Sequence, residues 1–147
     1  MPGWVKVLLI IAILVVLLVA GVVGGGAFLW YRYRDTVVAK TKSITEESQQ
    51  FGRHTDNQGC VDEALSRYRK DPGLSSAISS SLFMRFCLDA SRPTKGFCDD
   101  VPKQLEFMKS VQWRMAKCQE VRMQSDSNCP QLFAPVQQFC EENKKEH

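Results

Sequence analysis

The sequence predicts an all-α protein with a single N-terminal transmembrane helix and a small disulfide-stapled domain of about four helices. Three observations support this fold class. An uncharged apolar run lies near the start, apolar residues recur at helical spacing after it, and all six cysteines lie downstream of that run. No segment alternates between apolar and polar residues with a period of two, so we expect no β-strands.

Residues 1–34 are predicted to form a membrane anchor, with its transmembrane helix at about residues 7–30. The run Val7 to Leu29 contains 23 residues without a charge. As a helix it would span about 34 Å, compared with about 30 Å for the hydrocarbon core of a bilayer. It exceeds the apolar segment of a cleaved signal peptide, which favours a retained signal-anchor. Residues suited to the lipid headgroups flank the run at both ends, namely Trp4, Lys6, Trp30, Tyr31, Arg32, Tyr33 and Arg34.

Small residues recur four positions apart within the anchor, at Gly21 and Gly25. This spacing lets two membrane helices approach closely, and it predicts a helix-dimer face through which a homo-oligomer forms. The competing interpretation is that glycine is simply frequent in membrane helices.

Two indicators of membrane orientation disagree. Lys6 precedes the run, whereas Arg32, Arg34, Lys40 and Lys42 follow it, so the positive-inside rule places the domain in the cytoplasm. The dispersed, even set of cysteines instead predicts structural disulfides, which form in oxidising compartments. We give the cysteines more weight and expect the domain to lie outside the cytoplasm, in the periplasm or an equivalent space.

After the anchor, residues 35–56 are predicted to form a helical stalk or linker, because Val37, Ile44 and Phe51 recur at intervals of seven. The cysteine-rich domain is placed at residues 57–143. The last four residues, 144–147, are expected to form a tail.

The domain is expected to begin with two helices joined by a turn. The first starts near residue 57, is capped by Thr55 or Asp56, and stops at the Asp-Pro-Gly turn of residues 71–73. The second covers residues 74–90. Its apolar side is expected to contain Leu74, Ile78, Leu82 and Phe86.

Two further helices are expected in the second half of the domain. The third should start near Asp99 and continue to about residue 123, because acidic residues and Pro102 suit a first helical turn. After a turn at residues 124–128, Pro135 should kink or split the last helix.

Two disulfide pairings are consistent with these helices. In the first, Cys60 pairs with Cys87 across the 71–73 turn and Cys118 with Cys129 across the 124–128 turn. Cys98 then remains for Cys140, although straight helices would separate these two by about 20 Å. In the second, Cys87 pairs with Cys98 and Cys60 with Cys140. The sequence leaves both pairings open.

Composition and motifs exclude several functional classes. The whole chain has a net charge of +3, and 18 basic against 16 acidic residues follow the apolar run, so we expect no nucleic-acid partner. No Cys-x-x-Cys pair, metal-ligand spacing or glycine-rich phosphate loop occurs in the domain. We therefore predict no catalytic residue, no cofactor and no bound metal, and we expect that the protein is not an enzyme.

The sequence favours a non-enzymatic, single-pass membrane protein whose domain is an interaction or accessory module of a membrane assembly. Its expected partners are membrane lipid and other membrane or periplasmic proteins. The alternative is a thiol-based redox or metal-handling protein that uses its cysteines chemically. A third interpretation, a carrier of a small ligand, requires an apolar cavity between the helices.

Overall fold

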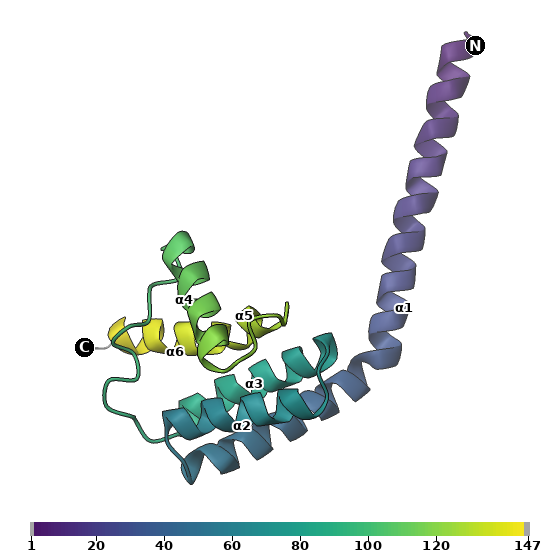
Figure 1. The fold of residues 1–147 in the computed structure, drawn as a ribbon. Coiled ribbons are helices and arrows are strands. Elements are labelled where there is room, and N and C mark those ends of the chain that lie inside the picture. The colour runs from purple at the N-terminus through teal and green to yellow at the C-terminus, as the bar shows by residue number, and fades with distance from the viewer. Residues whose placement is uncertain (1, 146–147) are drawn as a thin grey trace. The chain divides into compact units, whose positions relative to one another are not determined.

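The structure is a computed structural model that describes residues 2–145, and this part of the chain is all-α (Figure 1). Within that range it contains no strand, only an isolated bridge between Asp56 and Arg92. The predicted fold class is confirmed. The helices are α1 (Gly3–Arg53), α2 (Asn57–Lys70), α3 (Leu74–Ala90), α4 (Phe107–Glu120), α5 (Cys129–Leu132) and α6 (Ala134–Lys145).

The chain divides into two compact units, Met1–Thr41 and Lys42–His147. The first unit holds the apolar part of α1, a helix long and apolar enough to cross a membrane by length and composition. The second unit holds the end of α1, the other five helices and all six cysteines. Of the predicted tail, residues 144 and 145 continue α6, and residues 146 and 147 lie outside the described residues.

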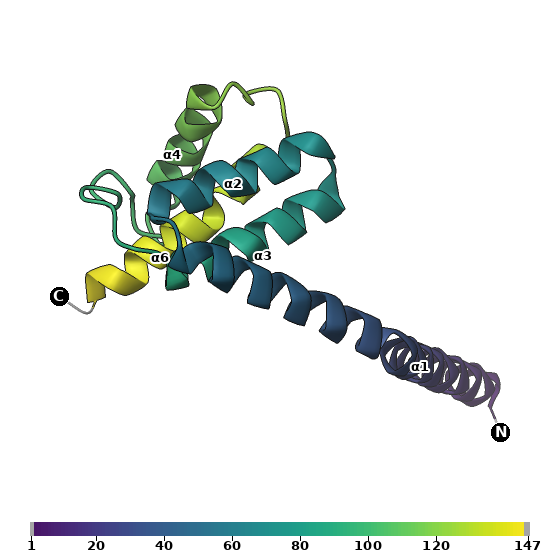
Figure 2. The same ribbon diagram turned by 90° about the horizontal axis from the view of Figure 1, so that it is seen from below.

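Residues 42–53, expected to belong to a stalk, pack with the domain in the structure. Ile44 and Phe51 of the seven-residue pattern lie against the core, whereas Val37 is exposed in the first unit. Ser48 and Gly52 are buried on the same stretch of helix. The end of α1 is therefore a structural element of the domain, and it runs alongside α3 (Figure 2).

Gly52 allows α1 and α3 to approach closely. A Cβ atom at this position would lie 2.6 Å from the carbonyl oxygen of Cys87 and 3.0 Å from Cβ of Ala90. Beside this contact, the rings of Phe51 and Phe83 have centroids 5.7 Å apart. The absence of a side chain at Gly52 thus sets the distance between the two helices.

Helix α2 begins and ends where the sequence predicts. Asp56 is its N-cap, and the Asp56 carboxylate accepts a hydrogen bond from the Gly59 amide at 2.9 Å. Helix α3 also covers the predicted residues, but the prediction of its apolar side was wrong. Leu74 and Ile78 are exposed. The buried residues of α3 are Ala77, Ser80, Phe83, Met84, Cys87 and Leu88.

The start of the third domain helix was also predicted wrongly, because α4 begins at Phe107 rather than near Asp99. The preceding segment folds as turns that α6 holds in place. Gln137 of α6 is fully buried, and its Nε2 donates to the carbonyl oxygen of Pro102 at 3.0 Å and to Ser110 Oγ at 2.6 Å. These long-range bonds take the place of helical hydrogen bonds in this segment.

The last predicted helix is split, as Pro135 indicated. Helix α5 ends at Leu132, Phe133 lies between the helices, and Pro135 falls in the first turn of α6. Proline is tolerated there because the first amides of a helix have no intrahelical acceptor.

The structure contains the first of the two disulfide pairings considered above. The Cα atoms are 5.7 Å apart in Cys60–Cys87, 5.3 Å in Cys98–Cys140 and 6.0 Å in Cys118–Cys129. The separation of about 20 Å expected for Cys98–Cys140 assumed a helix from Asp99 onward. Because residues 97–106 form turns instead, Cys98 reaches α6.

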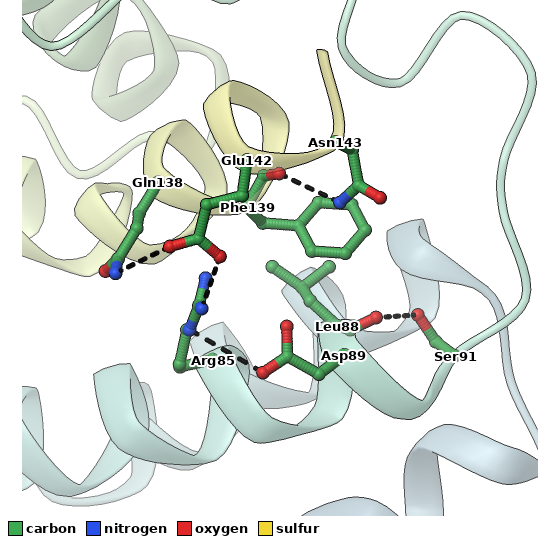
Figure 3. Close-up of polar contacts among 8 residues, drawn as sticks. All are labelled: Arg85, Leu88, Asp89, Ser91, Gln138, Phe139, Glu142 and Asn143. Atoms are coloured by element: carbon green, nitrogen blue, oxygen red, sulfur yellow. Dashed lines mark hydrogen bonds and ion pairs between the residues drawn. The ribbon is translucent and has the colours of Figure 1, made fainter. Parts of the chain in front are cut away.

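An ion-pair cluster at the surface joins α3 to α6 (Figure 3). Arg85 donates from Nη2 to Glu142 at 2.6 Å, and its Nε lies 3.6 Å from Asp89. Partial burial raises the pKa of Asp89, Arg85 acts in the opposite direction, and Glu142 raises it further. Phe139 and Leu88 lie beside the cluster in the same view, so polar and apolar contacts join the two helices together.

Replacing Gly52 by Ala is expected to destabilise the domain by about 1–3 kcal/mol, because the added methyl group would force α1 and α3 apart. The matched control is Gly73→Ala, where a Cβ would meet no atom within 4 Å. Urea unfolding of the full chain in detergent measures both. Equal free energies of unfolding for the two variants would contradict the described packing of α1.

The domain is expected to lose stability at alkaline pH because of the buried Tyr68. Burial and the hydrogen bond from its hydroxyl to Asp126, at 2.7 Å, raise its pKa above 10.0, although Asn128 acts in the opposite direction. Above pH 10 the unfolded chain therefore loses the Tyr68 proton before the folded chain does, and the free energy of unfolding falls.

The variant Tyr68→Phe lacks this ionisation but loses a hydrogen bond worth about 0.5–1.5 kcal/mol. We expect it to be less stable than the wild type at neutral pH, with a difference that shrinks as the pH rises above 10. Tyr33→Phe, at an exposed position, is the control. If the difference in free energy of unfolding between Tyr68→Phe and the wild type stays constant with pH, the raised pKa of Tyr68 is contradicted.

Candidate binding cleft

A cleft of about 330 Å³ opens in the domain between α2, the segment 94–100 and α4. This volume is near the lower end of the range of about 300–1,000 Å³ for small-molecule pockets. Buried apolar side chains line it from α2 and from the region of α5 and α6, namely Val61, Leu65, Phe133 and Val136.

The spacing of residues on the helices explains how these side chains meet. Val61 and Leu65 are four residues apart and therefore share one side of α2. Trp113 and Lys117 have the same relation on α4. The Trp113 ring packs edge to face against Phe133, with centroids 6.2 Å apart and an interplanar angle of 86°. An aromatic pair thus joins the α4 side of the cleft to its apolar lining.

The rim of the cleft carries paired charges. Lys117 Nζ lies 3.0 Å from Glu120 Oε2 and 3.4 Å from Asp100 Oδ2, which connects α4 to the 94–100 segment. Partial burial lowers the pKa of Lys117, but the two carboxylates more than offset this and raise it overall. The rim therefore combines a fixed cation with two acids above an apolar lining.

Two hydrogen-bond donors in the walls lack a partner. Within the described residues, Trp113 Nε1 and Thr94 Oγ1 are buried and have no hydrogen-bond acceptor. A buried donor without an acceptor costs about 1–3 kcal/mol. Both atoms have almost no exposed surface, so an acceptor on a bound molecule would reach them only after the surrounding residues shift.

Asn57 positions the segment that closes the cleft. This buried residue donates from Nδ2 to Ser91 Oγ at 2.8 Å, and its Oδ1 accepts from the Thr94 amide at 2.8 Å. Cys98–Cys140 fixes the same segment to α6. Sequence reasoning missed Asn57; its position directly after the helix cap Asp56 gives no sign of partners 34 and 37 residues away.

The cysteines predicted as disulfide candidates are all paired, and none in the described chain is free. Cys60, Cys87, Cys118, Cys129 and Cys140 are buried in the core, and Cys98 packs against it. Residues 2–145 contain no group of three or more His, Cys, Asp or Glu residues placed to hold a metal ion. The sulfur atoms thus brace the domain around the cleft.

The predicted membrane-interface residues occupy exposed positions of α1 in the first unit, and none of them lines the cleft. These are Trp4, Lys6, Trp30, Tyr31, Arg32, Tyr33 and Arg34. Of these, Arg34 stacks on the Tyr31 ring at 4.8 Å. A Cβ atom at Gly21 or Gly25, the expected helix-dimer face, would meet no atom within 4 Å, so this side of α1 is open.

No protein-family model, curated protein or solved structure matches the chain. The functional argument therefore depends on the cleft, the cysteines and the exposed surfaces of this molecule.

Removing Cys98–Cys140 with Cys98→Ser and Cys140→Ser is expected to cost about 4 kcal/mol, against about 3 kcal/mol for Cys118–Cys129. The difference arises because the bridged residues are 42 and 11 positions apart in the sequence. Urea unfolding gives the two costs. Hydrogen exchange at residues 94–100 should accelerate only in the first variant. A larger loss of stability on removing Cys118–Cys129, or unchanged hydrogen exchange in both variants, would contradict the role of Cys98–Cys140 in holding the segment 94–100.

Proposed function

We propose that this chain is a single-pass membrane protein whose domain lies outside the cytoplasm and acts as a non-enzymatic interaction module of a membrane assembly. The apolar length of α1 and the aromatic and basic residues around it support the membrane location. The three disulfides support an oxidising compartment for the domain.

The cleft between α2 and α4 is the observation that carries the interaction role. Its apolar lining suits one or two apolar side chains of a partner protein, and its rim of Lys117, Asp100 and Glu120 offers charged contacts that set the partner's orientation. Its walls are braced by a disulfide, so little ordering entropy is lost on binding. Membrane or periplasmic proteins are the expected partners.

Thiol redox chemistry or metal handling is the less favoured alternative. Reactive cysteines are accessible thiolates. Here five of the six cysteines are buried and every one is in a disulfide. Transport of a small ligand is favoured by one observation, the cleft volume of about 330 Å³. Self-association through Gly21 and Gly25 would add a second copy to the assembly.

Photo-crosslinking of the full chain in its native membrane tests the cleft. We expect p-benzoylphenylalanine at Gln58, on the rim, to give a discrete protein adduct, and the same residue at Lys70 to give none. Both positions are exposed on α2, but Lys70 does not line the cleft. Denaturing gels and mass spectrometry identify the adducts.

A variant that fills the cleft, Val121→Trp, should reduce the Gln58 adduct by about tenfold while the disulfides remain formed. Equal protein adducts from Gln58 and Lys70, or an adduct insensitive to Val121→Trp, would contradict the interaction role. An adduct with a small molecule alone would favour the ligand carrier.

A further inference from the structure

One side of α4 carries apolar side chains that the domain leaves exposed. Met108 is 66% exposed, Val111 42% and Met115 44%. Their spacing of three and four positions places them along one side of the helix, and we call these three residues the α4 stripe. Just before the stripe, Leu105 and Phe107 are 93% and 72% exposed. Large apolar groups gathered in this way indicate a surface that another molecule covers.

The helix that carries the α4 stripe is firmly held from another side. Gln137 of α6 donates from Nε2 to Ser110 Oγ at 2.6 Å, and its Oε1 accepts from Arg114 Nη2 at 2.7 Å. Ser110 Oγ in turn donates to the Lys103 carbonyl oxygen at 3.0 Å. The exposed side chains therefore project from an ordered helix, so little backbone entropy is lost when another molecule covers them.

The charges next to the α4 stripe favour neither an acidic nor a basic partner. Lys109 Nζ lies 2.6 Å from the Glu106 carboxylate. Lys103 adds a second cation to this turn, and the Glu141 carboxylate, which accepts from the Gln104 amide at 3.1 Å, adds a second acid. The stripe itself carries no charge. A neutral apolar surface of this kind can face an identical surface without like-charge repulsion.

The order of residues along this side of α4 suits a second copy of the chain. Gln112 is exposed beside Val111. In either direction, the exposed side presents a methionine, then the central Val111 and Gln112, and then a methionine. Two such helices placed antiparallel about a two-fold axis at their centre would pair Met108 of each copy with Met115 of the other. The surface is therefore self-complementary.

The exposed apolar area is sufficient for a specific dimer. At about 150–200 Å² for each fully exposed side chain, the stripe together with Leu105 and Phe107 exposes about 500–600 Å² on each copy. Covering it on both copies buries about 1,000–1,200 Å², close to the lower limit of about 1,200 Å² for stable specific interfaces. The polar rim that surrounds the apolar centre of such interfaces adds to this area.

We propose that the α4 stripe is the interface of a homodimer, in which the α4 helices of two copies pack antiparallel. Trp113 and Lys117 line the cleft from α4. Each is two positions from Met115 and hence about 200° around the helix, so the dimer leaves both clefts open. One consequence rests on the proposed function, namely that two open clefts let the dimer bind a partner assembly at two points, which raises the apparent affinity.

Photo-crosslinking between differently labelled copies tests the dimer. The full chain in mild detergent carries p-benzoylphenylalanine at Gln112, beside the expected axis, or at Ile78, an exposed apolar position on α3. Unlabelled and isotope-labelled chains are mixed before irradiation. We expect a covalent dimer of mixed labelling from Gln112, linked within residues 108–115 of the other copy, and none from Ile78.

Exchange of charges across the interface tests the pairing of residues. With the crosslinker at Gln112, Met108→Glu should reduce the dimer adduct about tenfold, because it places an unpaired carboxylate against Met115 of the other copy. Adding Met115→Lys to the same chain should restore most of the adduct, because opposite charges then meet twice. Gln50→Glu, at an exposed position of α1, adds the same charge and should have no effect. Unchanged disulfides and urea unfolding confirm that each variant is folded.

The variant Gly21→Leu plus Gly25→Leu separates this dimer from self-association through the anchor, and we expect the Gln112 adduct to persist in it. Loss of the adduct in this variant, no dimer from Gln112, or no recovery with Met115→Lys would overturn the inference. A partner adduct from Gln58 in a chain that gives no dimer from Gln112 would overturn it and leave the proposed role of the cleft intact.

Discussion

The disulfide between Cys98 and Cys140 is the constraint on which the arrangement of the domain depends. It joins a segment without helical hydrogen bonds to α6, at a sequence separation of 42 residues. The same segment supplies Phe97 and Asp100 to the cleft and leads into the start of α4. Because the net stability of a folded domain is only about 5–15 kcal/mol, a covalent link of about 4 kcal/mol is a large part of what keeps the segment in place.

Local signals in the sequence were sufficient to predict much of the helical framework. Asp56 marks the start of α2, the 71–73 turn separates α2 from α3, and Pro135 divides the last helix. Each signal acts within about four residues, which is the range over which capping and turn chemistry operate. The fold class and the ends of these helices therefore follow from residues that are neighbours in the chain.

The wrong or missing predictions, namely the buried side of α3, the start of α4 and the role of Asn57, share a different physical origin. Each depends on contacts between residues that are distant in sequence. Helix α3 is apolar on several sides, and its bond from Cys87 to Cys60 determines which side is buried. The start of α4 depends on Gln137, which lies 27 residues beyond its partner Ser110. Asn57, the first residue of α2, likewise holds one wall of the cleft through Ser91 and Thr94, which lie 34 and 37 residues later in the chain. Periodicity along the chain does not encode such pairs.

The proposed function requires a rigid domain that is held close to a membrane. Disulfides brace the walls of the cleft between α2 and α4. In the proposed function, self-association through Gly21 and Gly25 of α1 would add a contact between two copies of the chain.

Peptide mapping of the unreduced full chain by mass spectrometry tests the central claim most directly. The account predicts three linked peptide pairs, joining Cys60 to Cys87, Cys98 to Cys140 and Cys118 to Cys129, with no thiol available for alkylation. A link between Cys87 and Cys98, or alkylation of the six thiols without unfolding, would contradict it.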